Sequence, residues 1–198
     1  MGKRLVFATG NEHKMQEIRA ILRDTGYEIL SMKDAGITTD VEETGTSFEE
    51  NALLKASAIV EKAGCLVLAD DSGLEIDYLG GEPGIYSARY MGEDTDYHIK
   101  NQNLIDRLAG VPDAERTARF VCAIAAVWPD GRKEVVRGTI EGIIGYKEAG
   151  ANGFGYDPIF FLPERGMTTA ELPPEEKNAI SHRGNALKKM CALLESME

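Results

Sequence analysis

The sequence predicts an α/β fold, in which helices flank a sheet, and two stretches carry this prediction. The apolar run Leu5–Ala8 is followed by a polar loop and then by Met15, Ile18 and Leu22 at helical spacing, an order that indicates strand, loop and helix. A second apolar run, Val67–Ala69, is typical of a buried strand and ends abruptly in polar residues. In open α/β sheets, ligand-binding residues follow the strands in this way.

The rest of the chain supplies further strands and helices. Ser47 and Glu50 form a capping box, which predicts that a helix begins near Phe48 and continues to about Ala63. Asp130-Gly131 lies between two runs rich in Val and Ile and predicts a hairpin turn. The other elements expected are a strand at Tyr27–Leu30, a polar helix around 97–108, hairpin strands at 119–128 and 133–144, and an amphipathic helix after Ser181 that carries Leu187, Met190, Cys191 and Leu194.

Length and composition favour one globular domain over residues 1–198, with room for two lobes. Apolar residues make up 43% of the chain and charged residues 28%, which is ordinary for a soluble protein. The net charge of −11 argues against a partner such as duplex nucleic acid or a membrane surface, because both attract a basic face. An anionic small ligand remains compatible, since a few local cations act at short range.

The cysteines and the apolar runs predict a cytoplasmic protein without a membrane span. Cys65, Cys122 and Cys191 are odd in number and far apart, which argues against a disulfide framework or a zinc site. The longest apolar run, Phe120–Trp128, is too short to cross a bilayer. The first residues lack the apolar length of a secretory signal.

Two adjacent carboxylates, Asp70 and Asp71, form the first candidate site. Like charges side by side repel each other and prefer water or a cation, and carboxylate oxygens suit Mg²⁺. Ser72 adds a hydroxyl, and Gly73 allows the backbone to turn or to approach a ligand closely. These are also ordinary turn residues, so this stretch alone fits a solvated turn slightly better than a site, and other segments decide the matter.

The loop Thr9-Gly10-Asn11 and the helix start after it form the second candidate. Backbone N–H groups in such a loop can hold a phosphate. Lys14 lies in or near the first helical turn, where a cation opposes the helix dipole unless an anion is near. The alternative is an ordinary strand-to-helix turn with a surface lysine, and the spacing excludes a Walker A loop.

Lys55 is the third candidate, on the helix predicted to begin near Phe48. At ~100° per residue, Lys55 falls beside Phe48 and Ile59 on the buried side of that helix. Asn51 lies one turn before it on the same flank. Helical geometry leaves two alternatives open: the lysine extends outward to solvent, or it points into a cleft.

Two later segments favour recognition of a flat, polar ligand. Gly150–Pro158 surrounds aromatic residues with glycines, which can place an aromatic face against a ligand or form a flexible turn that packs Phe154 into the core. Ser181 is expected to cap the last helix, so that His182 and Arg183 fall in its first turn. Cations there oppose the helix dipole unless they serve an anion or a polar base edge, which favours a functional interpretation.

Six motifs in a fixed order connect these candidates. They are Thr9-Gly10-Asn11 with Lys14; Ser47-Phe48 with Asn51 and Lys55; Ala69-Asp70-Asp71-Ser72-Gly73-Leu74; Pro83-Gly84 with Ser87-Ala88-Arg89-Tyr90; Gly153-Phe154-Gly155-Tyr156-Asp157-Pro158; and Lys177 with Ile180-Ser181-His182-Arg183-Gly184. From about Leu5 to Leu194, this pattern resembles the inosine triphosphate pyrophosphatase family of nucleotide house-cleaning enzymes, also called Ham1-like or RdgB-like. Each motif is weak alone, and their common order makes the resemblance specific.

The resemblance implies a fold and an activity. The fold would be an elongated mixed β-sheet with flanking helices, forming two lobes around a central cleft, and the protein would be a homodimer. The activity would be Mg²⁺-dependent hydrolysis of ITP, dITP and XTP to the nucleoside monophosphate and pyrophosphate. Such hydrolysis keeps non-standard purine nucleotides out of DNA and RNA.

The resemblance also implies a role for each matching residue. Asp71 would bind the metal and accept a proton from the attacking water, Glu43 and Asp70 would support the metal, and Lys55 would be the second catalytic residue. The phosphates would be held by Thr9, Gly10, Asn11, Glu12, His13 and Lys14. The rest of the nucleotide would be contacted by Ser72, Phe154, Gly155, Tyr156, Asp157, Lys177, His182 and Arg183.

The residue types suit this chemistry on their own terms. Cleavage between the α- and β-phosphates needs charge neutralisation and an oriented water, which Lys14, Lys55 and the carboxylates can supply. Donors from His182 or Arg183 suit the 6-keto oxygen of hypoxanthine or xanthine, whereas the 6-amino group of adenine would meet them with another donor. Two other classes are weighed against an enzyme. A non-catalytic nucleotide-binding regulator would not need the acidic cluster, and an RNA-binding module would need a basic, aromatic surface.

Overall fold

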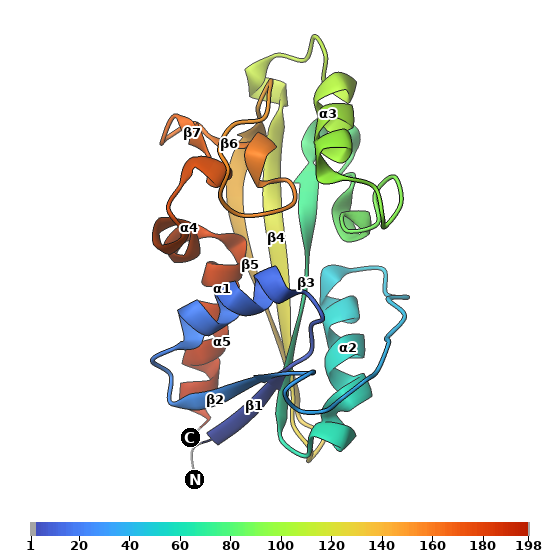
Figure 1. Cartoon of the computed structure of the whole chain (residues 1–198), viewed down its shortest axis with the longest axis vertical. Coiled ribbons are helices and arrows are strands. Elements are labelled where there is room, and N and C mark those ends of the chain that lie inside the picture. Colours follow the sequence, from blue (N-terminus) through green and yellow to red (C-terminus); the bar gives the residue numbers. More distant parts are fainter. Residues whose placement is uncertain (1–2, 198) are drawn as a thin grey trace. The chain divides into compact units, whose positions relative to one another are not determined.

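The computed structural model of the chain describes residues 3–197, which form strands and helices in alternation over the first half of the chain (Figure 1). The strands are β1 (Lys3–Phe7), β2 (Tyr27–Ser31), β3 (Leu66–Ile76), β4 (Thr117–Val127), β5 (Lys133–Ile144), β6 (Phe160–Leu162) and β7 (Met167–Thr168). The α-helices are α1 (Glu12–Leu22), α2 (Phe48–Ala63), α3 (Tyr97–Arg107), α4 (Pro174–Ile180) and α5 (His182–Ser196).

The strands belong to one mixed sheet with the order β2-β1-β3-β4-β5-β6-β7. β1 pairs in parallel with both β2 and β3. β6 pairs antiparallel with β5 and with β7. The predicted α/β class with a mixed sheet is therefore confirmed.

The helix predicted from the capping box is confirmed over the expected residues. The Ser47 hydroxyl accepts a hydrogen bond from the Glu50 amide at 3.2 Å, and α2 then runs from Phe48 to Ala63. The hairpin of β4 and β5 is also confirmed, and Gly131 adopts a φ of +90° in its turn. α4 could not be predicted from the sequence, because a seven-residue helix that begins at Pro174 has too few apolar positions to reveal a period.

Contacts divide the chain into two compact units, each made from separate parts of the sequence. Of the described residues, unit 1 contains 3–72, 122–138 and 182–197, and unit 2 contains 73–121 and 139–181. The predicted cleft between two lobes stays a prediction.

Unit 1 is packed on both faces of its strands. Side chains alternate along a strand, so Leu66 and Leu68 on β3 share one face and join the cluster that α1 and α5 cover. Figure 1 shows these two helices next to each other, and they are in contact. On α2, the apolar residues Phe48, Ala52, Ala56 and Ile59 are buried, whereas Ala63 at the end of the helix is half-buried.

A glycine lets the start of α5 lie against β5. A Cβ atom added at Gly138 would overlap the carbonyl oxygen of His182 and the amide nitrogen of Ala186. The backbone of α5 therefore approaches β5 at a point where any other residue would push it away. This contact fixes the position of the first turn of α5, which carries two of the predicted site residues.

Unit 2 has its own core and also buries the guanidinium of Arg116. Its apolar cluster joins β3, β4, β5, β6 and α3. Arg116 is 1% exposed and donates to the backbone carbonyls of Leu108, Ile144 and Gly145 at 2.7 to 2.8 Å. These hydrogen bonds replace the water that the guanidinium loses on burial, and no carboxylate partner is needed. Over residues 3–197, no helix has the length and apolar character that crossing a membrane requires.

Candidate functional site

β3 directs Asp70 and Asp71 to opposite faces of the sheet, because successive side chains of a strand alternate. Asp70 continues the row of Leu66 and Leu68 toward α1 and α5. Asp71 faces α2, where the Asn51 amide donates to its Oδ2 atom at 3.1 Å. The two neighbouring carboxylates thus contact two separate groups of side chains in unit 1.

Asp70 lies between two cations. Its Oδ2 atom is 3.0 Å from Lys14 Nζ and 3.3 Å from Arg183 Nη2, and its side chain is fully buried. Burial alone would favour the neutral acid, but Lys14, Arg183 and Lys55 outweigh it and hold the pKa of Asp70 well below its ordinary value. The other oxygen, Oδ1, is buried and accepts no hydrogen bond within the described chain. Asp70 is therefore ionised at neutral pH.

Arg183 lies in the first turn of α5, as predicted, and is 1% exposed. Its guanidinium forms a short ion pair with Glu17 of α1 and also contacts Asp70. It donates to the Ser72 hydroxyl at 3.1 Å. The charge that opposes the dipole of α5 is thus balanced by the half-buried carboxylate of Glu17 and the buried carboxylate of Asp70.

Asp71 is held by α2 and by its own strand. Besides the Asn51 contact, its Oδ1 atom accepts from the Ser72 amide at 3.1 Å. Burial raises the pKa of Asp71, the charge of Lys55 opposes this effect, and the charge of Glu43 adds to it. A carboxylate whose pKa is raised accepts a proton more readily than an exposed aspartate does.

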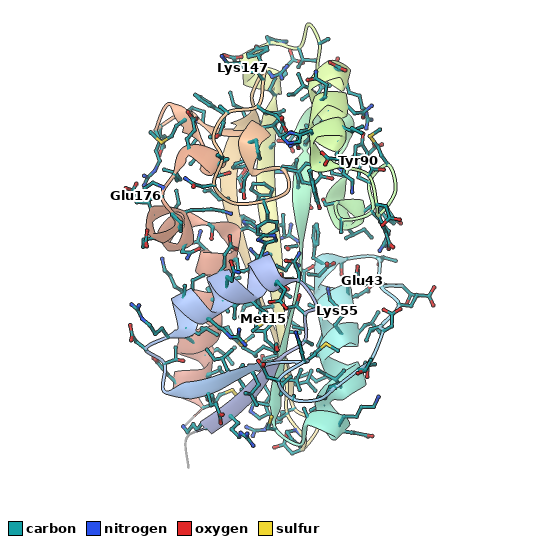
Figure 2. All side chains as sticks on the ribbon, viewed as in Figure 1. Met15, Glu43, Lys55, Tyr90, Lys147 and Glu176 are labelled. Atoms are coloured by element: carbon teal, nitrogen blue, oxygen red, sulfur yellow. The ribbon has the colours of Figure 1, made fainter. Side chains whose placement is uncertain are left out.

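Lys55 turns toward the carboxylates and not outward to solvent, which resolves the two alternatives that the helix geometry left open. Its Nζ atom lies 2.7 Å from Glu43 Oε1 and 3.5 Å from Asp71 Oδ1. Figure 2 shows the Glu43 and Lys55 side chains pointing toward one another. Burial favours the neutral amine, but Asp70, Asp71 and Glu43 outweigh it and raise the pKa of Lys55.

The loop from Thr9 to Lys14 leads into α1, and its role toward phosphate stays a prediction. Asn11 caps the helix, since its side chain accepts from the Lys14 amide at 3.1 Å. Gly10, Asn11, Glu12 and His13 are exposed. Lys14 turns its ammonium toward Asp70 from the first turn of α1. The start of α1 thus offers backbone N–H groups and one cation to an anion.

Glu43 and Asp71 fit a divalent cation such as Mg²⁺. Both carboxylates converge on the same ammonium group of Lys55, which neutralises only one of their two negative charges. Across residues 3–197, no three His, Cys, Asp or Glu side chains gather closely enough to hold an ion unaided. Mg²⁺ commonly uses one or two carboxylates and completes its shell with water and substrate phosphates, which two carboxylates allow. The metal role of Asp70 stays a prediction, because Lys14 and Arg183 already neutralise it.

The aromatic loop, residues 150–158, lies in unit 2, and hydrogen bonds to the Asp157 carboxylate hold its conformation. The Oδ2 atom of this residue accepts from the Phe154 amide at 2.9 Å and from Lys177 Nζ at 2.6 Å. Thr169 donates to the other carboxylate oxygen at 2.8 Å. The Lys177 ammonium also lies 5.1 Å from the centre of the Phe154 ring. Phe154 is half-buried, so part of its ring remains accessible.

The structure gathers the predicted site residues in two groups. Unit 2 holds Phe154, Gly155, Tyr156, Asp157 and Lys177. Unit 1 holds the other group, in which His182 is buried at the start of α5: Thr9, Gly10, Asn11, Glu12, His13, Lys14, Glu43, Lys55, Asp70, Asp71, Ser72, His182 and Arg183.

Comparison with known proteins identifies the family. A family model described as the Ham1 family matches residues 5–193. The chain belongs to the Ham1 family. The resemblance found in the motifs is therefore confirmed over nearly the whole sequence.

Relatives of this Ham1 chain include named enzymes and solved structures. It is 48% identical over 193 residues to a dITP/XTP pyrophosphatase of Bacillus licheniformis, covering 98% of each chain. It is 49% identical to a dITP/XTP pyrophosphatase of Clostridium perfringens, covering 95% of each. The solved Ham1 protein of Staphylococcus aureus is 42% identical with a TM-score of 0.88, covering 99% of this chain and 100% of that one. The Coxiella burnetii HAM1 protein is 39% identical with a TM-score of 0.88, covering 98% and 99%.

Two residues of this Ham1 site were not predicted to have a role. Glu17 lies three residues after Lys14, on the same face of α1, and this spacing was the signal available for it. Asn51 is fully buried, accepts from the Gly45 amide at 2.8 Å and donates to Asp71. Its position one turn before Lys55 was noted, but helical spacing gave no sign of the loop that it binds.

Replacing Arg183 by Leu should lower the free energy of unfolding by about 3–5 kcal/mol. The substitution removes a buried cation and leaves the buried carboxylate of Asp70 and the half-buried carboxylate of Glu17 without it. Removing one partner of a buried ion pair is strongly destabilising, because the charge that remains is no longer compensated. Urea denaturation monitored by circular dichroism measures this change.

Arg19→Leu is the matched control on α1. Arg19 pairs with Asp34, but both side chains are more than 40% exposed, and exposed pairs contribute about 0–1 kcal/mol. If Arg183→Leu costs no more than this control, the ion pairs of Arg183 do not stabilise the fold, and the residue is retained for another reason.

Proposed function

We propose that this Ham1 protein is a nucleoside triphosphate pyrophosphatase that hydrolyses dITP, XTP and ITP to the monophosphate and pyrophosphate. The observation that carries the proposal is the arrangement of Lys14 and Lys55 around Asp70 and Asp71 in unit 1. The two lysines can neutralise the charge of a polyphosphate, and the two carboxylates beside them can bind a metal ion or accept a proton. The names of the bacterial relatives, dITP/XTP pyrophosphatase, support the same activity.

The proposed chemistry is attack of water on the α-phosphorus. The water oxygen forms the new bond, the bond between the α-phosphorus and the bridging oxygen breaks, and pyrophosphate leaves. Asp71 takes the proton from the water, because it is the less strongly neutralised carboxylate of the pair. Lys14 and Lys55 neutralise negative charge on the phosphates and on the leaving pyrophosphate.

Glu43 and Asp71 are the residues that would hold Mg²⁺. When bound, the ion would neutralise phosphate oxygens and lower the pKa of a bound water. Asn51 orients Asp71 by its amide, and Lys55 keeps Glu43 and Asp71 in place between substrate molecules.

Two features suit recognition of a purine base, an aromatic ring and hydrogen-bond donors. Phe154 offers an aromatic face to a purine, and its backbone is fixed by Asp157. His182 and Arg183 carry donors that match a 6-keto oxygen and not a 6-amino group. Hydrolysis of such nucleotides would keep them out of DNA and RNA.

Product analysis tests the proposal directly. The protein is incubated with ITP, dITP, XTP, GTP and ATP, with Mg²⁺ or with EDTA, and pyrophosphate and orthophosphate are measured separately. We expect pyrophosphate and monophosphate from ITP, dITP and XTP with Mg²⁺, at least about tenfold less from ATP, and loss of activity with EDTA. Release of orthophosphate would place cleavage at the γ-phosphate and contradict the proposal, as would hydrolysis of ATP at the same rate as ITP.

A further inference from the structure

The segment Ser87–Tyr90 matches a family motif, but the proposed function gives it no task. Ser87 is 4% exposed and is fixed on two sides. Its hydroxyl accepts from the Leu74 amide at 2.8 Å and donates to the Gly84 carbonyl at 2.6 Å. The backbone at Ser87 is therefore attached to β3 and is a rigid support within unit 2.

Tyr156 connects this support to the aromatic loop. It is 4% exposed, and its hydroxyl donates to the carbonyl oxygen of Ser87 at 2.6 Å. The edge of its ring meets the ring of Tyr97, with centroids 5.2 Å apart and planes at 85°. Burial raises the pKa of Tyr156, so the hydroxyl remains a donor at any physiological pH. The one hydrogen that this side chain can donate is therefore already used within unit 2.

The residue before Tyr156 is held from α3. Asn101 is 1% exposed and donates to the Gly155 carbonyl at 3.3 Å and to Glu148 at 2.6 Å. Gly155 has a φ of +67°, and a Cβ atom there would lie 3.5 Å from the ring of Tyr97. Contacts from α3 and from Ser87 thus fix Gly155 and Tyr156, which directly follow the partly exposed ring of Phe154.

We infer that Tyr156 is a positioning residue for base recognition: its hydrogen bond to Ser87 sets the place at which Phe154 meets the purine. The inference rests on the proposed function and assigns a task to the Ser87–Tyr90 motif. Tyr156 then acts through Phe154 and does not touch the base. Loosening this bond should weaken discrimination between bases and leave the reacting phosphates undisturbed.

Tyr156→Phe removes one hydroxyl and keeps the ring. We expect the KM for ITP to rise about three- to tenfold, the size of effect that one hydrogen bond supports, with kcat within about twofold of wild type. The ratio of kcat/KM for ITP to that for ATP should contract by a similar factor. Hydrogen exchange followed by mass spectrometry should show faster exchange in peptides covering 150–158.

Tyr146→Phe is the control, because it also removes one tyrosine hydroxyl in unit 2, and this hydroxyl donates to Asp113 and not to Ser87. It should leave the kinetic parameters and the exchange of 150–158 at wild-type values. Asn101→Ala is a second variant that loosens the same loop from α3, and it should shift KM and exchange in the same direction.

Three results would overturn the inference. They are unchanged exchange and KM in Tyr156→Phe and Asn101→Ala, a fall in kcat at unchanged KM, and equal losses for ITP and ATP. If wild type releases no pyrophosphate from ITP, dITP or XTP, the proposed function fails. Hydrogen exchange then still decides whether the Ser87 contact fixes the loop.

Discussion

Asp71→Asn should abolish most turnover while the protein stays folded. The substitution keeps the size of the side chain, and its one remaining oxygen can still accept from the amide of Asn51 or from that of Ser72, although not from both. It removes the charge that faces Lys55 and the ability to accept a proton from water. Loss of a positioned general base commonly costs about 10²–10⁴-fold in rate, and loss of a metal ligand at the same atom adds to this. We expect kcat for ITP to fall at least about 100-fold.

Asp77→Asn controls for the loss of an ion-paired aspartate from the same stretch of chain. Asp77 directly follows β3 and pairs with Arg119 at 2.9 Å, outside the carboxylates that surround Lys55. Its variant should keep wild-type kcat. Steady-state pyrophosphate release, together with melting temperatures for both variants, makes the comparison. A folded Asp71→Asn protein with near-normal kcat would show that another residue accepts the proton.

The strands and long helices were predictable because the apolar residues of each follow the spacing that is typical of a strand or of a helix. The capping box at Ser47 fixed the start of α2 to the residue, since cap, acidic turn and apolar stripe agree there. The segments from Gly150 to Ile180 were not predicted in detail. They fold as short 3₁₀ turns, two short strands and α4, which carry no period and are held by individual side chains such as Asp157.

The sequence predicted the helices that carry Lys55 and Arg183 but not the contacts of these residues. The prediction that a strand ends at Asp70 and Asp71 was wrong, because β3 continues through both residues to Ile76. The alternation of β3 between two helix layers explains why the two carboxylates have different partners. Arg183 was predicted to serve the base edge because its charge opposes the dipole of α5. The structure shows that Glu17 and Asp70 already balance this charge, so its role toward the base stays a prediction.

Lys55→Met should remove activity with little loss of stability, because methionine preserves an apolar stem of similar length and deletes only the charge. In the native protein the Lys55 side chain is 16% exposed, and its ammonium faces Glu43 and Asp71. The variant leaves these two carboxylates without the cation, but the Glu43 side chain is 25% exposed, and Asp71 still accepts hydrogen bonds from Asn51 and from the Ser72 amide. The cost in unfolding free energy should therefore stay below the ~3–5 kcal/mol of a fully buried broken pair.

The effect on catalysis should be much larger. A preorganised cation that meets developing phosphate charge contributes about 10²–10³-fold in rate, and we expect kcat/KM for ITP to fall by this factor in Lys55→Met. Lys62→Met is the matched control on the same helix, since Lys62 is exposed and donates to Thr39. Pyrophosphate release and thermal melts on both variants distinguish the two roles of Lys55. A large fall in melting temperature with kcat/KM maintained would show that Lys55 supports the fold and does not act on the triphosphate.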